Sequence, residues 1–128
     1  MERLRISSGS PWEARAGYSR AVRAGACVYV AGTTGTDASG AVVAPDGYAQ
    51  AKKALERIVA ALHEAGASVE DVVRTRMYVT DINQWEAIGR AHAEVFGDAR
   101  PASTMVEVRR LIAPDIVVEI EADAVLGK

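Results

Sequence analysis

The chain has 128 residues, of which 49% are apolar and 25% are charged, and its formal net charge is −2. This length predicts one domain, residues 1–128, and the composition is ordinary for a globular protein. The slight acidic excess argues against a nucleic-acid partner, because a surface that binds phosphates usually carries an excess of Lys and Arg.

Nothing in the sequence indicates export or insertion into a membrane. The N-terminal residues lack the apolar stretch of a signal peptide, and no segment approaches the ~20 apolar residues of a membrane helix. Cys27 is the only cysteine, which excludes an intrachain disulfide, and its apolar flanks predict a buried thiol in a strand. We therefore expect a cytoplasmic protein with no membrane partner.

The first third of the chain predicts short strands. Residues 3–7 alternate between polar and apolar side chains, and Ser8 to Pro11 break the pattern, so that Trp12 and Glu13 are assigned to a loop. Two apolar runs, residues 18–24 and 26–31, meet at Gly25 and predict a hairpin. Residues 32–40 predict a further loop, which matches no phosphate-binding fingerprint.

A first helix is predicted to begin near Asp46, whose side chain can accept a hydrogen bond from the free amides of the first turn. Apolar residues then recur at helical spacing as one stripe: Ala51, Leu55, Ile58, Leu62 and Ala65. Gly66 can adopt the left-handed conformation that ends a helix. Residues 72–80 follow as a strand, with four side chains predicted to share one face: Val73, Thr75, Met77 and Val79.

A second helix is predicted after Asn83, because Glu86 follows three residues later as in a capping box, and Gly97 ends it. Residues 102–110 and 115–126 are the last two strands. This order of elements predicts an α+β fold, a mixed sheet of about six strands with two helices on one face. The other face needs cover, and self-association supplies it if that face is apolar.

The two histidines, His63 and His92, have no cysteine or carboxylate at a ligand spacing. We therefore expect no metal site. Both histidines are interpreted as surface or packing residues on the predicted helices.

The last two strands are more informative, because they carry carboxylates among apolar residues. Strand alternation places Ser103, Met105 and Glu107 on one face, and it also places Glu119 and Glu121 on a common face. Two interpretations of these glutamates stay open. They form an exposed polar face, or they lie in a cleft where burial raises the pKa of a general acid.

Two segments of these strands form a signature, Val106-Glu107-Val108 followed by Val118-Glu119-Ile120-Glu121-Ala122. Further matching segments are residues 17–22, residues 30–33, the helix that contains Gln50 and Ala51, and residues 78–81. In this order and spacing they resemble the reactive intermediate deaminase family, also called RidA/YjgF-like. The resemblance covers nearly the whole chain, and the predicted order of elements agrees with the fold of that family.

The resemblance implies a chorismate-mutase-like fold assembled as a homotrimer, with small-molecule sites in clefts between subunits. Enzymes of the family hydrolyse reactive enamines and imines, such as 2-aminoacrylate, to a keto acid and ammonia, and use no cofactor. Carried over to this sequence, the resemblance implies that Glu119 positions or activates water and that Tyr18 lines the pocket. Ala31 and Gly32 take the place of a Ser-Gly pair, and Met105 stands where a cysteine is frequent.

One position departs from the pattern of the family. Where the family has an arginine that holds the substrate carboxylate through a two-pronged salt bridge, this chain has Ser103, directly after Pro101 and Ala102. A serine donates one neutral hydrogen bond, and the loss of such a charged contact typically costs ~2–5 kcal/mol of binding free energy. We therefore expect a substrate other than simple 2-aminoacrylate. Four arginines are candidates to substitute: Arg20, Arg76, Arg109 and Arg110.

Two kinds of function remain open at this point. The first is a hydrolase or deaminase in which Glu119 handles water and Ser103 contacts a neutral group of a different substrate. The second is a non-catalytic trimer that binds or senses a metabolite. A ribonuclease, an activity attached to some members of the family, is disfavoured by the acidic balance and by the absence of a basic stripe.

Overall fold

The computed structural model describes residues 2–127. The helices and strands follow one another along the chain as β1 (Arg3–Ile6), α1 (Pro11–Ala16), β2 (Ala21–Ala24), β3 (Cys27–Thr34), α2 (Gly47–Glu64), η1 (Val69–Asp71), β4 (Val72–Val79), η2 (Ile82–Gln84), α3 (Trp85–Phe96), β5 (Ala102–Glu107) and β6 (Val118–Val125).

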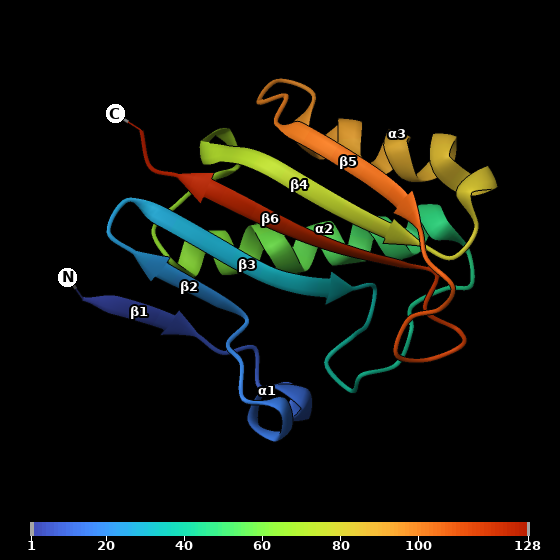
Figure 1. The fold of residues 1–128 in the computed structure, drawn as a ribbon, viewed down its shortest axis with the longest axis horizontal. Helices are drawn as coiled ribbons and strands as arrows, with labels where there is room; N and C mark the ends of the chain where they lie inside the picture. The colour runs from blue at the N-terminus through green and yellow to red at the C-terminus, as the bar shows by residue number, and fades with distance from the viewer. Residues whose placement is uncertain (1, 128) are drawn as a thin grey trace.

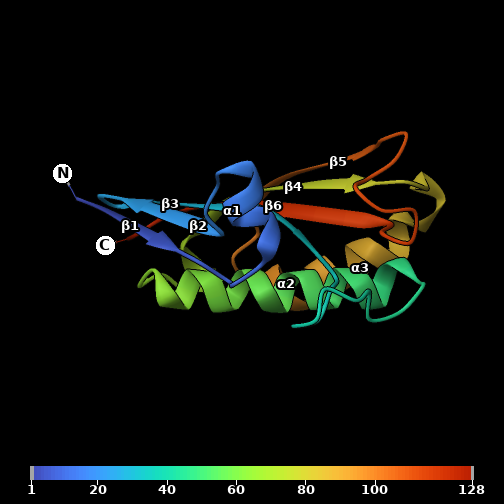
Figure 2. The ribbon, with the colours of Figure 1, turned by 90° about the horizontal axis from the view of Figure 1, so that it is seen from below.

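One six-stranded sheet organises the molecule, with the strands in the order β1-β2-β3-β6-β4-β5. Neighbouring strands are antiparallel except β4 and β5, which run parallel and are connected through α3. Helices α2 and α3 pack against each other on one face of the sheet (Figures 1 and 2). The predicted α+β architecture, a mixed sheet with two main helices on one face, is confirmed.

Helix α2 forms where the sequence predicts it. Asp46 accepts a hydrogen bond from the Ala49 amide at 2.9 Å and caps the first turn. Gly66, with a φ of 86°, provides the left-handed residue just beyond the helix. The predicted apolar stripe is buried against the sheet in its entirety: Ala51, Leu55, Ile58, Leu62 and Ala65.

Strand β6 lies in the middle of the sheet, so alternation along it decides what each face presents. Val118, Ile120, Ala122 and Ala124 are buried under the helices. The carboxylates of Glu119, Glu121 and Asp123 alternate with them and lie on the opposite face, which α2 and α3 leave uncovered (Figure 2). We call this second surface the open face of the sheet.

The path of the C-terminal segment differs from a simple series of hairpins. β5 and β6 are consecutive in the chain, yet β6 pairs with β3 and β4, and β5 lies at the edge beside β4 (Figure 1). The strands are also shorter than the predicted ranges 102–110 and 115–126. The long connection between them, residues 108–117, lets the chain return to the centre of the sheet.

Irregular pairing displaces one residue from its predicted face. The register between β4 and β6 shifts between Val72 and Arg74, and Val73 is 48% exposed while Thr75, Met77 and Val79 remain buried. A bulge of this kind adds one residue to a strand, so simple alternation fails at that point.

Two short segments also differ from their prediction. Trp12 and Glu13 lie in helix α1, whose first turn is capped by Ser10, rather than in a loop. Gly32 belongs to β3, which continues to Thr34 before the loop begins. The predicted capping box at the second helix is absent in residues 2–127, because the side chain of Asp81 accepts from the Asn83 amide and starts η2 instead.

Cys27 is half-buried, and it alternates with the buried Val28 so that it lies on the open face, near the exposed Tyr29. The prediction that the Cys27 thiol is buried in the core is therefore wrong. Cys27 forms no disulfide among the described residues. Among residues 2–127, no helix is long and apolar enough to cross a membrane.

Candidate functional site

The carboxyl group of Glu119 is positioned by the close approach of strands β3 and β6. Glu119 pairs with Thr34 in the register of the sheet, beside an irregularity in β3 between Val30 and Thr33. The Glu119 carboxyl lies against Gly32, where any β-carbon would clash with Oε2. A glycine at position 32 is therefore what allows the carboxyl to occupy this half-buried place.

Burial raises the pKa of Glu119 above its ordinary value. The positive charge of Arg20 lowers that pKa in part, whereas the negative charge of Glu121 raises it further. A half-buried carboxyl with a raised pKa exchanges protons nearer to neutral pH, as a general acid or base requires. Partial burial and a raised pKa thus agree with the second of the two interpretations for Glu119, although the groove on the same face is lined by Glu121 and not by Glu119.

Glu121 is half-buried as well, and it lines an open groove on this face. It forms an ion pair with Arg76 at 3.4 Å, and Arg76 also pairs with Asp123 at 3.2 Å. Tyr78 donates a hydrogen bond to Glu121 at 3.0 Å, and this bond raises the pKa of the Tyr78 hydroxyl. The centre of the open face is thus a polar network in which Arg76 is already paired, so Arg76 is not free to bind a ligand carboxylate.

Arg20 is the most buried of the arginine candidates, at 4% exposure. Its Nη1 donates to the hydroxyl of the fully buried Thr33 at 3.1 Å, and within residues 2–127 its Nε has no hydrogen-bond partner. Its guanidinium lies 5.6 Å from the centre of the Tyr18 ring. A buried cation thus supports Tyr18 and faces the region of Glu119.

A second carboxyl, Glu13 on α1, completes this buried charge cluster. Burial alone would raise the pKa of Glu13, but hydrogen bonds from Ser8 and Ser7 and the charge of Arg20 hold it below its ordinary value. Glu13 thereby ties α1 to the chain that leaves β1. The sequence indicated neither its burial nor that of Arg20, because α1 has only six residues and shows no readable periodicity, and Arg20 lies in the connection before β2.

An open groove of about 470 Å³ lies beside this cluster on the open face. Tyr18 and Ala31, two of the predicted site residues, line it together with Tyr29 and the network around Arg76. Tyr18 is 40% exposed, so its ring is available to a ligand or to a neighbouring subunit. Four predicted residues therefore lie at the β2, β3 and β6 part of the sheet: Tyr18, Ala31, Gly32 and Glu119.

Ser103 and Met105 lie elsewhere in the chain. They belong to β5, and strands β6 and β4 separate β5 from β3. Their register partners Thr75 and Met77 are buried under the helices, so Ser103 and Met105 lie at the edge of the helix-covered face. Within one chain, the structure does not bring them to the groove beside Tyr18.

Ser103 has partners that sequence analysis missed. The buried Thr75 donates a hydrogen bond to the Ser103 hydroxyl at 2.8 Å, and the Thr75 oxygen lies 2.8 Å from His92 Nε2. Burial lowers the pKa of the half-buried His92, whose ring packs against Phe96 with centroids 4.8 Å apart. One sequence feature could have revealed this contact: Thr75 is a polar residue on the predicted inner face of its strand, where the other side chains are apolar.

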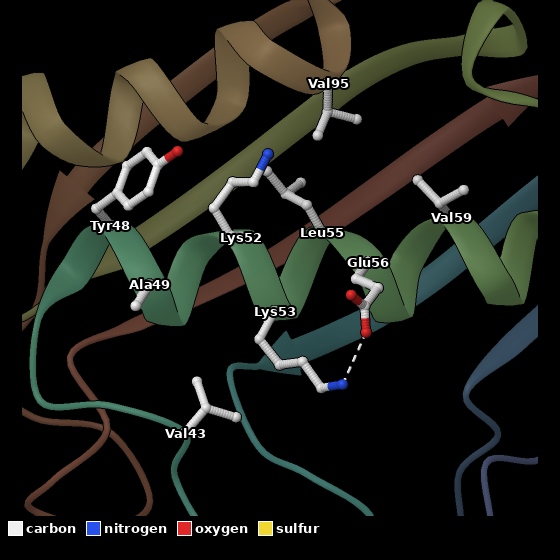
Figure 3. Close-up of a pocket in the computed structure, with 9 residues that line it drawn as sticks. All are labelled: Val43, Tyr48, Ala49, Lys52, Lys53, Leu55, Glu56, Val59 and Val95. Carbon is white, nitrogen blue, oxygen red and sulfur yellow. Dashed lines mark hydrogen bonds and ion pairs between the residues drawn. The ribbon is translucent and has the colours of Figure 1, made fainter.

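A larger cavity, of about 560 Å³, lies away from all of these residues, between α2, α3 and the loop before α2 (Figure 3). Two lysines line it, and both are paired: Lys53 with Glu56 at 2.7 Å and Lys52 with Glu94 at 3.0 Å. The rest of its lining is largely apolar, with Val43, Val59 and Val95 among the residues drawn in Figure 3. The charged side chains that line this cavity are therefore all engaged in ion pairs.

No group of three or more His, Cys, Asp or Glu side chains within residues 2–127 is placed to hold a metal ion.

Comparison with known proteins places these residues in context. Residues 9–126 match the family model described as Endoribonuclease L-PSP. The crystal structure of Rv2704 from Mycobacterium tuberculosis, a member of the YjgF/YER057c/UK114 family, is 54% identical in sequence. It superposes with a TM-score of 0.91 over 98% of this chain and 100% of that one.

Two further relatives carry names that describe chemistry or a ligand. The 2-iminobutanoate/2-iminopropanoate deaminase of Salmonella typhimurium is 35% identical over 84% of this chain and 86% of its own length. The Escherichia coli protein TdcF, solved with bound serine, is 28% identical and has a TM-score of 0.80, covering 96% of this chain and 94% of that one.

Proposed function

Since the chain belongs to the Endoribonuclease L-PSP family of RidA/YjgF-type proteins, we propose that it is a small-molecule hydrolase that acts on enamines or imines. The observation that carries the proposal is the half-buried Glu119 carboxyl, held against Gly32 with a raised pKa. The name of the Salmonella relative, an imine deaminase, supports the same reaction class.

In the proposed reaction, water adds to the carbon of a C=N bond. Glu119 accepts a proton from that water as the C–O bond forms, and the imine nitrogen takes up a proton from solvent. Glu119 then returns its proton to the nitrogen of the resulting carbinolamine. The C–N bond breaks, ammonia leaves and the hydroxyl proton passes to solvent, which gives a carbonyl product. The raised pKa suits both halves of this cycle, because the same carboxyl must take up a proton and release it.

The substrate we propose is not simple 2-aminoacrylate. Ser103 supplies no positive charge at the position where the family holds a carboxylate, and Arg74 and Arg76 of the adjacent β4 alternate away from Thr75, toward the open face. A carboxylate placed at Ser103 would lose about 2–5 kcal/mol of binding free energy relative to a paired one. A neutral group at this end of the substrate avoids that cost.

We also propose that the protein is a homotrimer whose sites lie between subunits. Two separated groups of site residues motivate this assembly: Tyr18, Ala31, Gly32 and Glu119 on one side of the chain, and Ser103 with Met105 at the β5 edge. The open face also exposes Tyr29, Val106 and Val125. Light scattering on the purified protein is expected to give three times the 13.6 kDa chain mass, and a stable monomer would contradict the proposal.

We place this activity in the cytoplasm and propose that it needs no metal or organic cofactor. The free Cys27 on the open face suits a reducing compartment. Dialysis against a chelator is expected to leave turnover unchanged, and loss of turnover that a metal restores would contradict the cofactor part of the proposal.

The deciding experiment compares two imines that differ in charge. Iminopropanoate is generated from alanine by an amino-acid oxidase, and an imine without a carboxylate is generated from a primary amine by an amine oxidase. We expect the protein to accelerate hydrolysis of the neutral imine more strongly than that of iminopropanoate. Efficient hydrolysis of iminopropanoate that is abolished by Glu119→Gln would show that the substrate argument is wrong.

A matched control separates loss of the Glu119 carboxyl from loss of any acidic group. Glu64 is exposed at the last turn of α2. Glu64→Gln is expected to retain full activity, whereas Glu119→Gln is expected to lose about 100-fold or more, the usual range for a general acid–base group.

The alternative is a trimer that binds a metabolite without converting it. TdcF with bound serine is a relative whose name records a ligand rather than a reaction. The half-buried Met105, packed against the core at the β5 edge, fits a binding site as well as a catalytic one. This alternative predicts ligand-dependent thermal stabilisation with no product from any imine.

A further inference from the structure

A continuous line of hydrogen bonds runs from α3 to the outer edge of the sheet. His92 Nε2 lies 2.8 Å from the Thr75 hydroxyl oxygen, which lies 2.8 Å from the Ser103 hydroxyl oxygen. Thr75 is fully buried, His92 is half-buried, and Ser103 is exposed on β5. The line therefore connects a buried imidazole to a surface hydroxyl at the position where the family has its arginine. We call it the Ser103 relay.

Each of the three side chains in the Ser103 relay can both donate and accept a hydrogen bond. A neutral imidazole has one N–H and one bare nitrogen, and each hydroxyl has one hydrogen and two lone pairs. When His92 carries its hydrogen on Nε2, it donates to Thr75, Thr75 donates to Ser103, and the Ser103 hydrogen is free to point outward. When His92 carries its hydrogen on Nδ1, every bond reverses and Ser103 accepts from outside.

The packing of His92 favours the neutral ring that this behaviour requires. The imidazole is held against Phe96, and burial lowers its pKa. The ring can therefore adopt either tautomer, and a hydrogen bond at one nitrogen determines which of them is preferred.

We propose that Ser103, together with Thr75 and His92, forms a subsite for a neutral polar group of the ligand, such as a carbonyl, an amide or a hydroxyl. Ser103 contacts the ligand, and His92 is a positioning residue that acts through Thr75. This inference rests on the proposed function, because it assumes that the β5 edge borders the ligand site. It names the substrate class: a small molecule that is uncharged at the end where relatives bind a carboxylate.

The chemistry of the neighbouring residues supports a neutral ligand group. The relay contains no fixed charge, and Arg76 is already paired with Glu121 and Asp123 on the other face of the sheet. A carbonyl or an amide can satisfy Ser103 in one of its two hydrogen-bond directions. A carboxylate could only accept a hydrogen bond from Ser103, and its negative charge would have no positive partner in the relay.

Nitrogen NMR of the full chain, in its native assembly and labelled at histidine, tests the proposal directly. The probes are pyruvamide and pyruvate, which differ only in an amide against a carboxylate. We expect pyruvamide to shift the Nε2 resonance of His92, because a new bond at Ser103 changes the tautomer preference along the relay. The exposed His63, the only other histidine, is an internal control and is expected to remain unshifted.

Variants identify the path of the response. Ser103→Ala is expected to abolish the His92 shift and to weaken pyruvamide binding roughly threefold to tenfold, the range for one hydrogen bond. Thr75→Val is expected to abolish the His92 shift, although Ser103 still binds pyruvamide. Thr104→Ala removes a neighbouring hydroxyl on the opposite face of β5 and is expected to change neither affinity nor shift. Ser103→Arg is expected to reverse the preference in favour of pyruvate.

Three results would overturn the inference. Pyruvamide leaves the Nε2 resonance of His92 unshifted, pyruvate shifts it equally, or the shift persists in Ser103→Ala. The wild-type spectrum alone decides the first two, so a variant that fails to fold leaves the test intact. A His92 response without imine hydrolysis would contradict the proposed hydrolase function only. Imine hydrolysis without a shift of the His92 resonance would contradict the proposed role of the Ser103 relay only.

Discussion

The carboxyl group of Glu119 occupies the volume that a side chain on Gly32 would need. A β-carbon built on Gly32 would clash with Oε2 of Glu119 and lie 3.0 Å from its carboxyl carbon. The absence of a side chain at Gly32 in β3 therefore determines where the Glu119 carboxyl of the neighbouring strand β6 lies.

Gly32→Ala is accordingly expected to displace the Glu119 carboxyl while the fold is retained. The clashing atoms belong to the end of a flexible side chain, so the free energy of unfolding should change by no more than about 1 kcal/mol. A displacement of about 1 Å typically costs on the order of 100-fold in turnover. Urea unfolding and steady-state kinetics measure the two quantities.

The matched control for this variant is Gly89→Ala in α3. Apart from its neighbours in the chain and the backbone of α3, no atom of the described residues lies within 4 Å of a β-carbon built on Gly89. An alanine in a helix interior is favoured over glycine by about 0.5–1 kcal/mol, so this variant should be slightly more stable and fully active. If Gly32→Ala kept wild-type turnover, the position of the Glu119 carboxyl would not matter to the reaction.

The raised pKa of Glu119 makes a prediction about stability and pH. Burial favours its neutral form in the folded state, so its contribution to stability is fully present below the ordinary pKa of 4.5 and is lost as the pH rises through the folded pKa. Glutamine is neutral throughout. Glu119→Gln should therefore match the wild type at pH 4 and exceed its free energy of unfolding at pH 8.

Urea unfolding of both proteins at the two pH values measures this difference, because every other titrating group is common to them. The same change at the exposed Glu2 controls for the loss of a negative charge as such. A glutamine variant that is less stable than the wild type at pH 8 would show that the Glu119 carboxylate has a stabilising partner in the assembled protein.

Arg20 provides a separate prediction about the rate. Its positive charge lowers the pKa of Glu119, so Arg20→Gln should raise that pKa further. If ionised Glu119 accepts the proton of water, the rise of kcat/KM with pH should move to higher pH in Arg20→Gln. Arg20→Lys retains the charge and should restore the position of the profile. A profile that shifts equally in both variants would indicate a structural effect of the guanidinium rather than its charge.

Local signals predicted much of this fold. Asp46 and Gly66 delimit α2 as predicted, and the alternation of Glu119 and Glu121 on one face of β6 is confirmed, because caps and strand alternation depend on neighbouring residues alone. The two glutamates nevertheless have different surroundings: Glu121 pairs with Arg76 from β4, whereas Glu119 lies against Gly32 from β3. These surroundings depend on the insertion of β6 between two strands that come earlier in the chain.

The parts that sequence analysis missed depend on similar long-range contacts. Val73 lies outside the core because of a register shift against β6, and His92 meets Thr75 only after α3 has crossed over β4 and β5. Arg20 was a candidate among four arginines. Its burial beneath Tyr18 requires Thr33 from another strand, a contact that no local pattern specifies.

Gln50 links α2 to the segment that leads into β6, and its loss should test how strongly that link holds the site. The fully buried amide donates to Ala44 O and Asp115 O, each at 2.8 Å, and accepts from the Val117 amide at 2.9 Å. Gln50→Leu keeps a similar volume but leaves three backbone groups without their partner, and we expect it to cost about 3 kcal/mol in the free energy of unfolding.

Gln84→Leu offers a graded control, because the Gln84 side chain accepts one hydrogen bond, from the Gly47 amide at 2.8 Å. The expected cost there is about 1 kcal/mol. Val117 lies two residues before Glu119, so Gln50→Leu should also reduce turnover in conditions where the protein remains folded, whereas Gln84→Leu should not. Equal losses of stability in the two variants would mean that water replaces the Gln50 amide and that β6 is held in place by its strand pairing alone.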